Sequence, residues 1–164
     1  MNTSETGAGV SFEQTTFYDA MEFLGLGRVK IAAESVGRTN WLLETATAFA
    51  NDRDVRADDW KFHGIFHKIA WGRANAFAAD AAGLRCAWQL DQGNGAIAES
   101  SICKRLATNT FWEVADDVVQ IHGSGGLAEE NPFMDNLYRA RIMRIVEGTD
   151  DIQLNTIAKQ YGVE

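Results

Sequence analysis

The stretch FHGIFHKIAWGRANAFAADAAGLRCAW, residues 62–88, decides the fold class of this 164-residue chain. Its apolar residues recur at intervals of three and four, which is the spacing along one face of an α-helix and not the alternation of a β-strand. No other segment of the sequence sustains strand alternation. The stretch therefore predicts a long amphipathic helix in an all-α protein, with an apolar stripe of Phe62, Ile65, Phe66, Ile69, Ala76, Phe77, Ala81, Leu84 and Trp88.

Two helical segments precede this stretch. Residues 28–52 are rich in alanine and apolar on more than one face, as expected of a helix packed between neighbours. Before them, Ser11 begins a capping-box pattern, so we expect order to start near it and the small, polar residues 1–10 to be flexible. Gly25 and Gly27 are expected to weaken or bend the first helix.

Three helical segments follow the stretch. The turn sequence DQGNG, residues 91–95, separates it from an apolar pattern over residues 97–121, and the two apolar stripes are expected to bury each other. After a glycine-rich break, proline opens a segment over residues 132–146, and a last helix covers residues 150–161. Together these segments predict an all-α up-and-down bundle of about four long helices plus shorter ones, forming one domain over residues 11–164.

The composition fits one globular domain and excludes several classes of protein. Hydrophobic residues make up 46% of the chain, enough for a core, and the formal net charge of -8 argues against a nucleic-acid binder. No apolar run approaches the ~20 residues of a membrane span, and the start MNTSETGAGVSFEQ lacks the features of a secretory signal. We therefore expect a cytoplasmic protein in which Cys86 and Cys103 are small buried residues without a chemical role.

His63 and His67 lie four residues apart on the predicted helix of residues 62–88, a spacing that can bind a metal ion. The pattern lacks the glutamate of an H-E-x-x-H site, and the sequence has no E-x-x-H pair of the kind that holds di-iron centres in helical bundles. Phe62 and Phe66 are interleaved with the two histidines, which is typical of ordinary helix residues. We predict no metal site.

The segment QIHGSGG, residues 120–126, follows the helix of residues 97–121 and has two interpretations. Glycines after a helix commonly supply a C-cap and a turn. They also leave backbone N–H groups accessible, so that successive amides can bind a phosphate as an anion nest. The segment does not follow a strand, so a Rossmann-type dinucleotide site is not expected. The residues alone leave the other two interpretations open.

Glu147-Gly148-Thr149 places a carboxylate where one predicted helix ends and the next begins. A surface turn would be satisfied by Asn, Ser or Asp, whereas Ile145 and Val146 directly before the glutamate indicate a carboxyl group directed into an apolar place. The simpler interpretation is a helix end at which Gly148 supplies the turn and Thr149 caps the next helix. That interpretation leaves the choice of glutamate unexplained.

Three motifs together resemble one protein family. GRVKIAAESVG (residues 27–37), VVQIHGSGGLAEENP (118–132) and RIVEGTDDIQLNTIAK (144–159) are similar, in order and spacing, to the C-terminal helical domain of the flavin-dependent acyl-CoA dehydrogenases. The resemblance implies an oxidoreductase that uses FAD. It implies that Glu147 is the catalytic base, which removes the α-proton of an acyl-CoA thioester while a hydride leaves the β-carbon for the flavin. It also implies that Arg28 lies near the base and the substrate.

The resemblance further implies a divided FAD site. Arg53 matches an arginine that contacts the FAD pyrophosphate, and Thr149 and Asp151 match positions beside the flavin. In the family, the glycine-rich segment reaches the FAD of a neighbouring subunit. The cofactor-binding positions implied there are Gln120, Gly123, Ser124 and Gly125.

Departures from the family pattern favour a second, non-enzymatic hypothesis. Where the family commonly has Phe-Gly and a flavin-contacting glutamine, the chain has Arg56-Ala57 and Gly64, and Tyr138-Arg139 replaces the usual Arg-Asp before the base. The family enzymes also contain an N-terminal helical domain and a middle β domain that this sequence does not supply. We therefore expect a split subunit or fragment, active only in a homo- or hetero-oligomer with a chain that carries those domains. The alternative is a non-catalytic helical assembly domain that pairs with an FAD-bearing partner chain.

Overall fold

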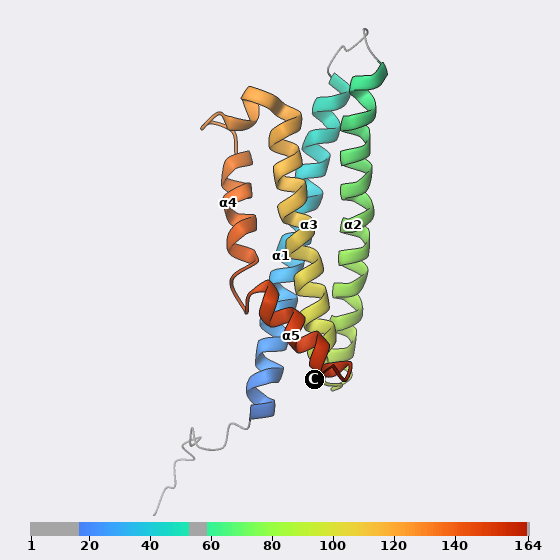
Figure 1. The fold of residues 1–164 in the computed structure, drawn as a ribbon, viewed down its shortest axis with the longest axis vertical. Helices are drawn as coiled ribbons and strands as arrows, with labels where there is room; N and C mark the ends of the chain where they lie inside the picture. Colours follow the sequence, from blue (N-terminus) through green and yellow to red (C-terminus); the bar gives the residue numbers. More distant parts are fainter. Residues whose placement is uncertain (1–16, 53–58, 164) are drawn as a thin grey trace, which may run out of the picture.

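The computed structural model describes residues 17–52 and 59–163, so the predicted flexible segment 1–10 and the predicted start near Ser11 lie outside it. Within the described residues the backbone forms α-helices and a 3-10 helix and no strand, none of the helices is long and apolar enough to cross a membrane, and the predicted all-α bundle is confirmed. In chain order the elements are α1 (Phe17–Asp52), α2 (Asp59–Asp91), α3 (Ile97–His122), η2 (Gly123–Leu127), α4 (Phe133–Met143) and α5 (Asp150–Gln160) (Figure 1).

The helices α1, α2 and α3 form an antiparallel bundle with α3 as its central element. Figure 1 shows α1 rising, α2 descending and α3 rising again, with α4 descending beside α3 and α5 crossing the lower end. α3 contacts every other element named above, and both α1 and α2 pack more extensively on α3 than on each other. The predicted up-and-down order is therefore confirmed.

The core follows the helical periodicity predicted for α1 and α3. From α1 it takes Leu42, Leu43 and Ala46, in the segment predicted to pack on more than one face. Cys86 and Cys103 are both buried free thiols, as predicted, in a second and smaller cluster between α1, α2 and α3. The main cluster is completed by Ala76, Phe111, Val114, Ala115, Val118, Ile121, Phe133, Ala140 and Met143.

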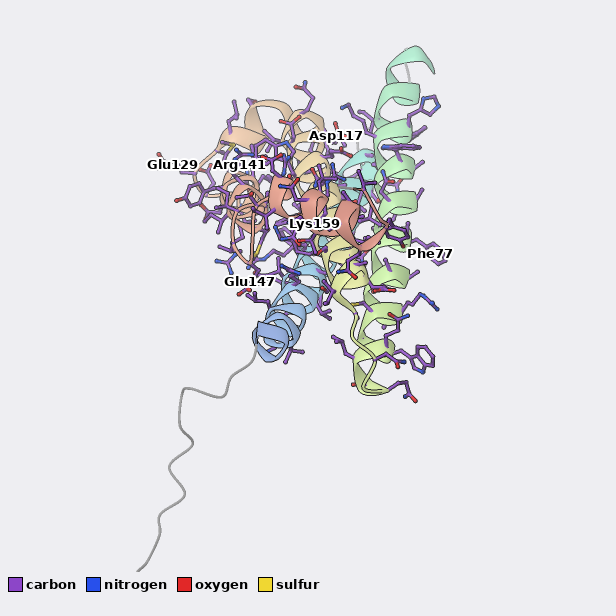
Figure 2. The ribbon with its side chains drawn as sticks, turned by 60° about the horizontal axis from the view of Figure 1, so that its bottom comes forward. Phe77, Asp117, Glu129, Arg141, Glu147 and Lys159 are labelled. Atoms are coloured by element: carbon purple, nitrogen blue, oxygen red, sulfur yellow. The ribbon has the colours of Figure 1, made fainter. Side chains whose placement is uncertain are left out.

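The helix α2 packs mainly through small residues, with Ile65 and Ile69 half-buried against the core, and exposes most of its other large apolar residues, so the predicted burial of its whole stripe is wrong. At Gly72 an added Cβ would come within 2.7 Å of Leu43 and 2.9 Å of Val114, and Ala76 and Ala79 are buried. This close approach to α1 and α3 needs small side chains, which leaves the large ones on the outer side. Figure 2 shows Phe77 pointing away from the bundle. The exposed large residues of the stripe are Phe66, Phe77, Leu84 and Trp88.

Two helix boundaries differ from the sequence pattern. α1 is a single helix that runs without a break through Gly25 and Gly27. α4 begins at Phe133, after Pro132 as its N-cap residue, and it ends at Met143. The helix predicted over residues 132–146 is therefore shorter, and the residues before α5 are free to form the turn that carries Glu147.

Candidate functional site

Glu147, Gly148 and Thr149 form the turn between α4 and α5. Glu147 has φ 55 and Gly148 has φ 94, so both lie in the left-handed region. Among the non-glycine residues that the structure describes, Glu147 alone has a positive φ. This conformation costs a residue with a Cβ about 1–2 kcal/mol. Such a backbone persists only where its surroundings hold it.

Four side chains hold this turn from two sides. Lys104 of α3 is fully buried, and its Nζ donates a hydrogen bond to the carbonyl oxygen of Gly148 at 2.8 Å. Gln153 of α5 is also buried and donates from Nε2 to the same oxygen at 2.9 Å and to the preceding carbonyl oxygen at 3.0 Å. Arg144 and Asp150 form an ion pair of 2.6 Å that joins the two ends of the turn.

The Glu147 carboxylate lies against the backbone of α1 (Figure 2). A Cβ added to Gly27 would lie 2.7 Å from Oε2 of Glu147, so the glycine leaves the room that this carboxylate occupies. Arg28 is buried next to it and donates from Nη1 to Ser101 Oγ at 3.2 Å. Burial lowers the pKa of Arg28, and the negative charge of Glu147 opposes that shift. The structure therefore brings the two predicted catalytic residues together.

The surroundings of Glu147 in this chain are open, which differs from the apolar place expected from its neighbours. Glu147 is exposed, and so are Ile145 at 52% and Val146 at 37%. The reason is that α4 ends at Met143, so the two apolar residues do not continue its buried face. The chain thus presents a carboxylate flanked by apolar side chains on its surface.

Thr149 and Asp151 follow the carboxylate on the same surface. Thr149 is the N-cap residue of α5, as the simpler interpretation of the turn predicts, but its side chain makes no capping hydrogen bond. Asp151 lies in the first turn of α5. Both residues are exposed, so both are accessible from outside the chain.

The glycine-rich segment forms η2 at the far end of α3 (Figure 1). Gly123 has φ 59, and its N–H bonds to the carbonyl oxygens of Val119 and Gln120, so this amide caps α3 and is not free for a phosphate. Gly126 is buried, and a Cβ there would lie 2.4 Å from the Val119 oxygen. The C-cap interpretation is therefore confirmed at Gly123. Gln120, Gly123 and Ser124 are exposed, and an added Cβ at the partly exposed Gly125 would meet no other atom within 4 Å.

Comparison with known proteins identifies the family. The acyl-CoA dehydrogenase C-terminal domain matches residues 17–162. This chain belongs to the acyl-CoA dehydrogenase family.

Individual relatives and similar structures are longer than this chain. It is 31% identical over 144 residues to the 3-(aryl)acrylate reductase of Clostridium sporogenes, a match that covers 87% of this chain and 38% of the reductase. The butyryl-CoA dehydrogenase structure of Megasphaera elsdenii has a TM-score of 0.83 at 28% identity, over 90% of this chain and 39% of that one. The structure of PigA with FAD and proline has a TM-score of 0.81 at 26% identity, over 90% of this chain and 38% of that one. The chain therefore spans less than half the length of these relatives and corresponds to their C-terminal domain.

The predicted site residues of this acyl-CoA dehydrogenase domain fall into two groups near opposite ends of α3. Lys104, which bonds to the turn, and Gln120 are sixteen residues apart on α3, which is about 24 Å at 1.5 Å per residue. Arg53 lies outside the described residues. The turn that contains Glu147 and Thr149 and is followed by Asp151 lies by Lys104, and Arg28 of α1 bonds to Ser101 of the same end of α3. The C-terminal end of α3 and the following η2 contain Gln120, Gly123, Ser124 and Gly125.

Sequence reasoning missed Lys104 and Gln153. A signal for Lys104 existed, because it lies on the same helical face as Ala107 and Phe111, which are both buried. A polar residue that falls on an apolar stripe is a candidate for an inward role. Gln153 is the one buried residue of α5, so no apolar stripe on that helix marks its position.

The histidines of α2 give no metal centre in the part of the chain that the structure describes. No three His, Cys, Asp or Glu side chains there are placed to hold an ion, and the side chain of His63 is outside that part. His67 is exposed and lines an open groove of about 560 Å³ between α2 and α3. Lys68 and Asp117, which form an ion pair, line the same groove with Ala70 and Trp71.

Proposed function

We propose that this chain supplies the catalytic base of an acyl-CoA dehydrogenase, Glu147, together with part of the FAD site. It would do so in an assembly that also contains the N-terminal helical domain and the middle β domain of the family. The observation that carries the proposal is the unfavourable backbone of Glu147, which Lys104 and Gln153 hold in place. A residue without this cost, such as glycine, would make the turn more stable. A strained residue kept at a turn therefore supports a need for its side chain.

In the proposed reaction, the Glu147 carboxylate accepts the α-proton of an acyl-CoA thioester as the β-hydride departs. FAD, when bound, would supply the hydride acceptor. Arg28 places a buried positive charge beside the carboxylate, and Gly27 leaves the space into which the carboxylate fits. A general base works best where water is excluded. Because Glu147 is exposed here, the domains that cover it in the assembly would provide that exclusion.

The residues at the two ends of α3 fit a divided FAD site. Around η2, the exposed Gln120 and Ser124 offer polar groups, and the open backbone at Gly125 leaves room for a phosphate. At the other end, Thr149 and Asp151 are accessible directly after the base and would contact the flavin. The separation of about 24 Å along α3 supports an arrangement in which η2 serves the FAD of a neighbouring chain. Arg53 would contact the FAD pyrophosphate. Gly123 would form the turn that leads from α3 into η2.

An apolar surface on α2 supports assembly into a homo- or hetero-oligomer. Phe77, Leu84 and Trp88 are 78%, 66% and 54% exposed and recur at helical spacing. Soluble monomers rarely leave so continuous a row of large apolar side chains uncovered. We place a contact with another subunit on this row.

A reconstitution experiment tests the split site. The chain would be purified alone and also after co-expression with a chain that carries the N-terminal and middle domains of an acyl-CoA dehydrogenase. Alone, it should carry no flavin absorbance after gel filtration, because half a pocket does not offset the entropy lost on binding. The co-expressed pair should show flavin absorbance, and butyryl-CoA should reduce that flavin. A yellow chain that an acyl-CoA reduces without a partner would refute the split-site proposal.

The role of Glu147 is tested in the same reconstituted pair. Glu147→Gln keeps the size of the side chain and removes the basic oxygen, so turnover should fall by the ~10²–10⁴-fold typical of a lost general base. Flavin content should stay unchanged. The matched control is Glu113→Gln, at an exposed position of α3 away from the turn. Equal turnover of the two variants would place the base elsewhere and would support the non-catalytic assembly domain.

A further inference from the structure

We infer that Lys104 is a positioning residue for the base and that it acts on Glu147 through the carbonyl group of Gly148. The inference rests on the proposed role of Glu147. Lys104 is fully buried, and its hydrogen-bond partner is a backbone carbonyl of the turn. A buried ammonium group costs free energy unless its surroundings compensate it. A lysine kept inside the bundle to bind one carbonyl oxygen therefore points to a function of that contact.

The contact fixes the conformation of the residue before it. The Gly148 oxygen accepts hydrogen bonds from Lys104 at 2.8 Å and from Gln153 at 2.9 Å, and the Glu147 oxygen accepts one from Gln153 at 3.0 Å. Both peptide planes after the base are thus anchored, one of them from both α3 and α5. With these planes fixed, the left-handed φ of Glu147 directs its carboxylate onto Gly27.

The charges around the turn suit this task. Burial is the main cause that lowers the pKa of Lys104, and the carboxylates of Asp150 and Glu147 oppose the shift, whereas Arg28 and Arg144 add to it. The positive charges of Arg28 and Lys104 both interact with the negative charge of Glu147, whereas Arg144 is paired with Asp150. Lys104 does not touch the carboxylate in the hydrogen bonds that the structure gives, so its influence passes through the backbone.

Lys104→Met tests the inference, because methionine keeps the length and apolar stem and removes the donor. The matched control is Lys68→Met on α2, which removes a lysine from an ion pair far from the turn. Amide hydrogen exchange of the purified chain would be measured over residues 144–150 and over the core of α3. Exchange in the turn should rise roughly 10- to 100-fold, the factor expected for one lost hydrogen bond to a charged group, while the α3 core stays unchanged. Lys68→Met should change the exchange of neither the turn nor the α3 core.

A kinetic readout in the reconstituted pair separates positioning from mere stability. Lys104→Met should lower kcat by a similar factor of roughly 10- to 100-fold with little change in KM or flavin content. A faster-exchanging turn with unchanged kcat, or an unchanged turn, would overturn the inference. If Glu147→Gln retains turnover, the proposed function fails, whereas the exchange data still report whether Lys104 holds the turn.

A second measurement needs no variant, so it tests the inference even if Lys104→Met does not fold. In the unmodified chain, the carbonyl carbon resonance of Gly148 would be followed by NMR as Lys104 is titrated with base. The Gly148 carbonyl resonance should shift over the same pH range in which Lys104 loses its proton, because loss of the ammonium charge weakens the hydrogen bond to that carbonyl. A Gly148 signal that does not follow the titration of Lys104 would overturn the inference.

Discussion

Replacing Glu147 with asparagine should stabilise the chain while it removes the proposed base. The left-handed φ of 55 costs a residue with a Cβ about 1–2 kcal/mol. Asparagine tolerates this region better than other non-glycine residues, because its short amide bonds to the local backbone. Glu147→Gln keeps the full strain and serves as the matched control, since both variants lose the carboxylate beside Arg28. The difference between them should be about 0.5–1 kcal/mol in favour of asparagine.

Urea denaturation followed by circular dichroism measures this difference. For a chain of this size, about 0.5–1 kcal/mol corresponds to a rise in Tm of roughly 1–4 °C, so thermal unfolding gives an independent check. An asparagine variant that is no more stable than the glutamine variant would show that Glu147 is not strained. That result would also remove the observation on which the proposed function depends.

Three further predictions concern other parts of the chain. Gly126→Ala should lower the free energy of unfolding by about 1–3 kcal/mol, because its Cβ would lie 2.4 Å from a backbone oxygen, whereas Gly125→Ala points into open space and should have little effect in the same thermal unfolding experiment. For Glu34, partial desolvation raises the pKa, but hydrogen bonds from two arginines outweigh it and lower the pKa below the ordinary value of 4.5. Its contribution to stability is therefore present above 4.5 and lost as the pH falls through the lowered pKa, so Glu34→Gln should cost under ~1 kcal/mol in urea titrations at neutral pH and nothing in strong acid. Phe77→Glu, at a side chain 78% exposed, should dissociate the assembly in analytical ultracentrifugation, and an unchanged sedimentation coefficient would contradict the proposed α2 contact.

Local patterns were sufficient to predict most of the fold. The periodic residues predicted for residues 28–52 and 97–121 are buried or half-buried, because an apolar stripe in the middle of a bundle has packing partners along its length. The stripe of α2 was harder to interpret, since a face that packs in the core and a face that packs on another subunit have the same composition. What separates them is Gly72, whose role depends on Leu43 and Val114 on two other helices.

Two residues of the candidate site could be predicted from the sequence, but the side chains that hold the turn and the geometry of the turn could not. The motif around Glu147 and the position of Arg28 were sufficient to bring two residues into one hypothesis, and the structure places them together. The left-handed backbone of the turn could not be predicted, because it depends on hydrogen bonds from the distant Lys104 of α3 and from Gln153, whose inward orientation no sequence pattern indicates. From the sequence alone, Gly27 predicts only a weakened helix. Its role in leaving room for the Glu147 carboxylate depends on a contact with a residue far along the chain.

The central place of α3 has a consequence for biosynthesis. Polypeptides emerge from the ribosome from the N-terminus, so α1 and α2 are complete before any of residues 97–122 exists. Each of these two helices packs more extensively on α3 than on the other, so neither finds its principal partner until that stage of translation. During this interval the residues of both helices that pack on α3 and the large apolar row of α2 are exposed together. Nascent chains should therefore depend on chaperones, and products terminated before Ile97 should be removed by proteolysis.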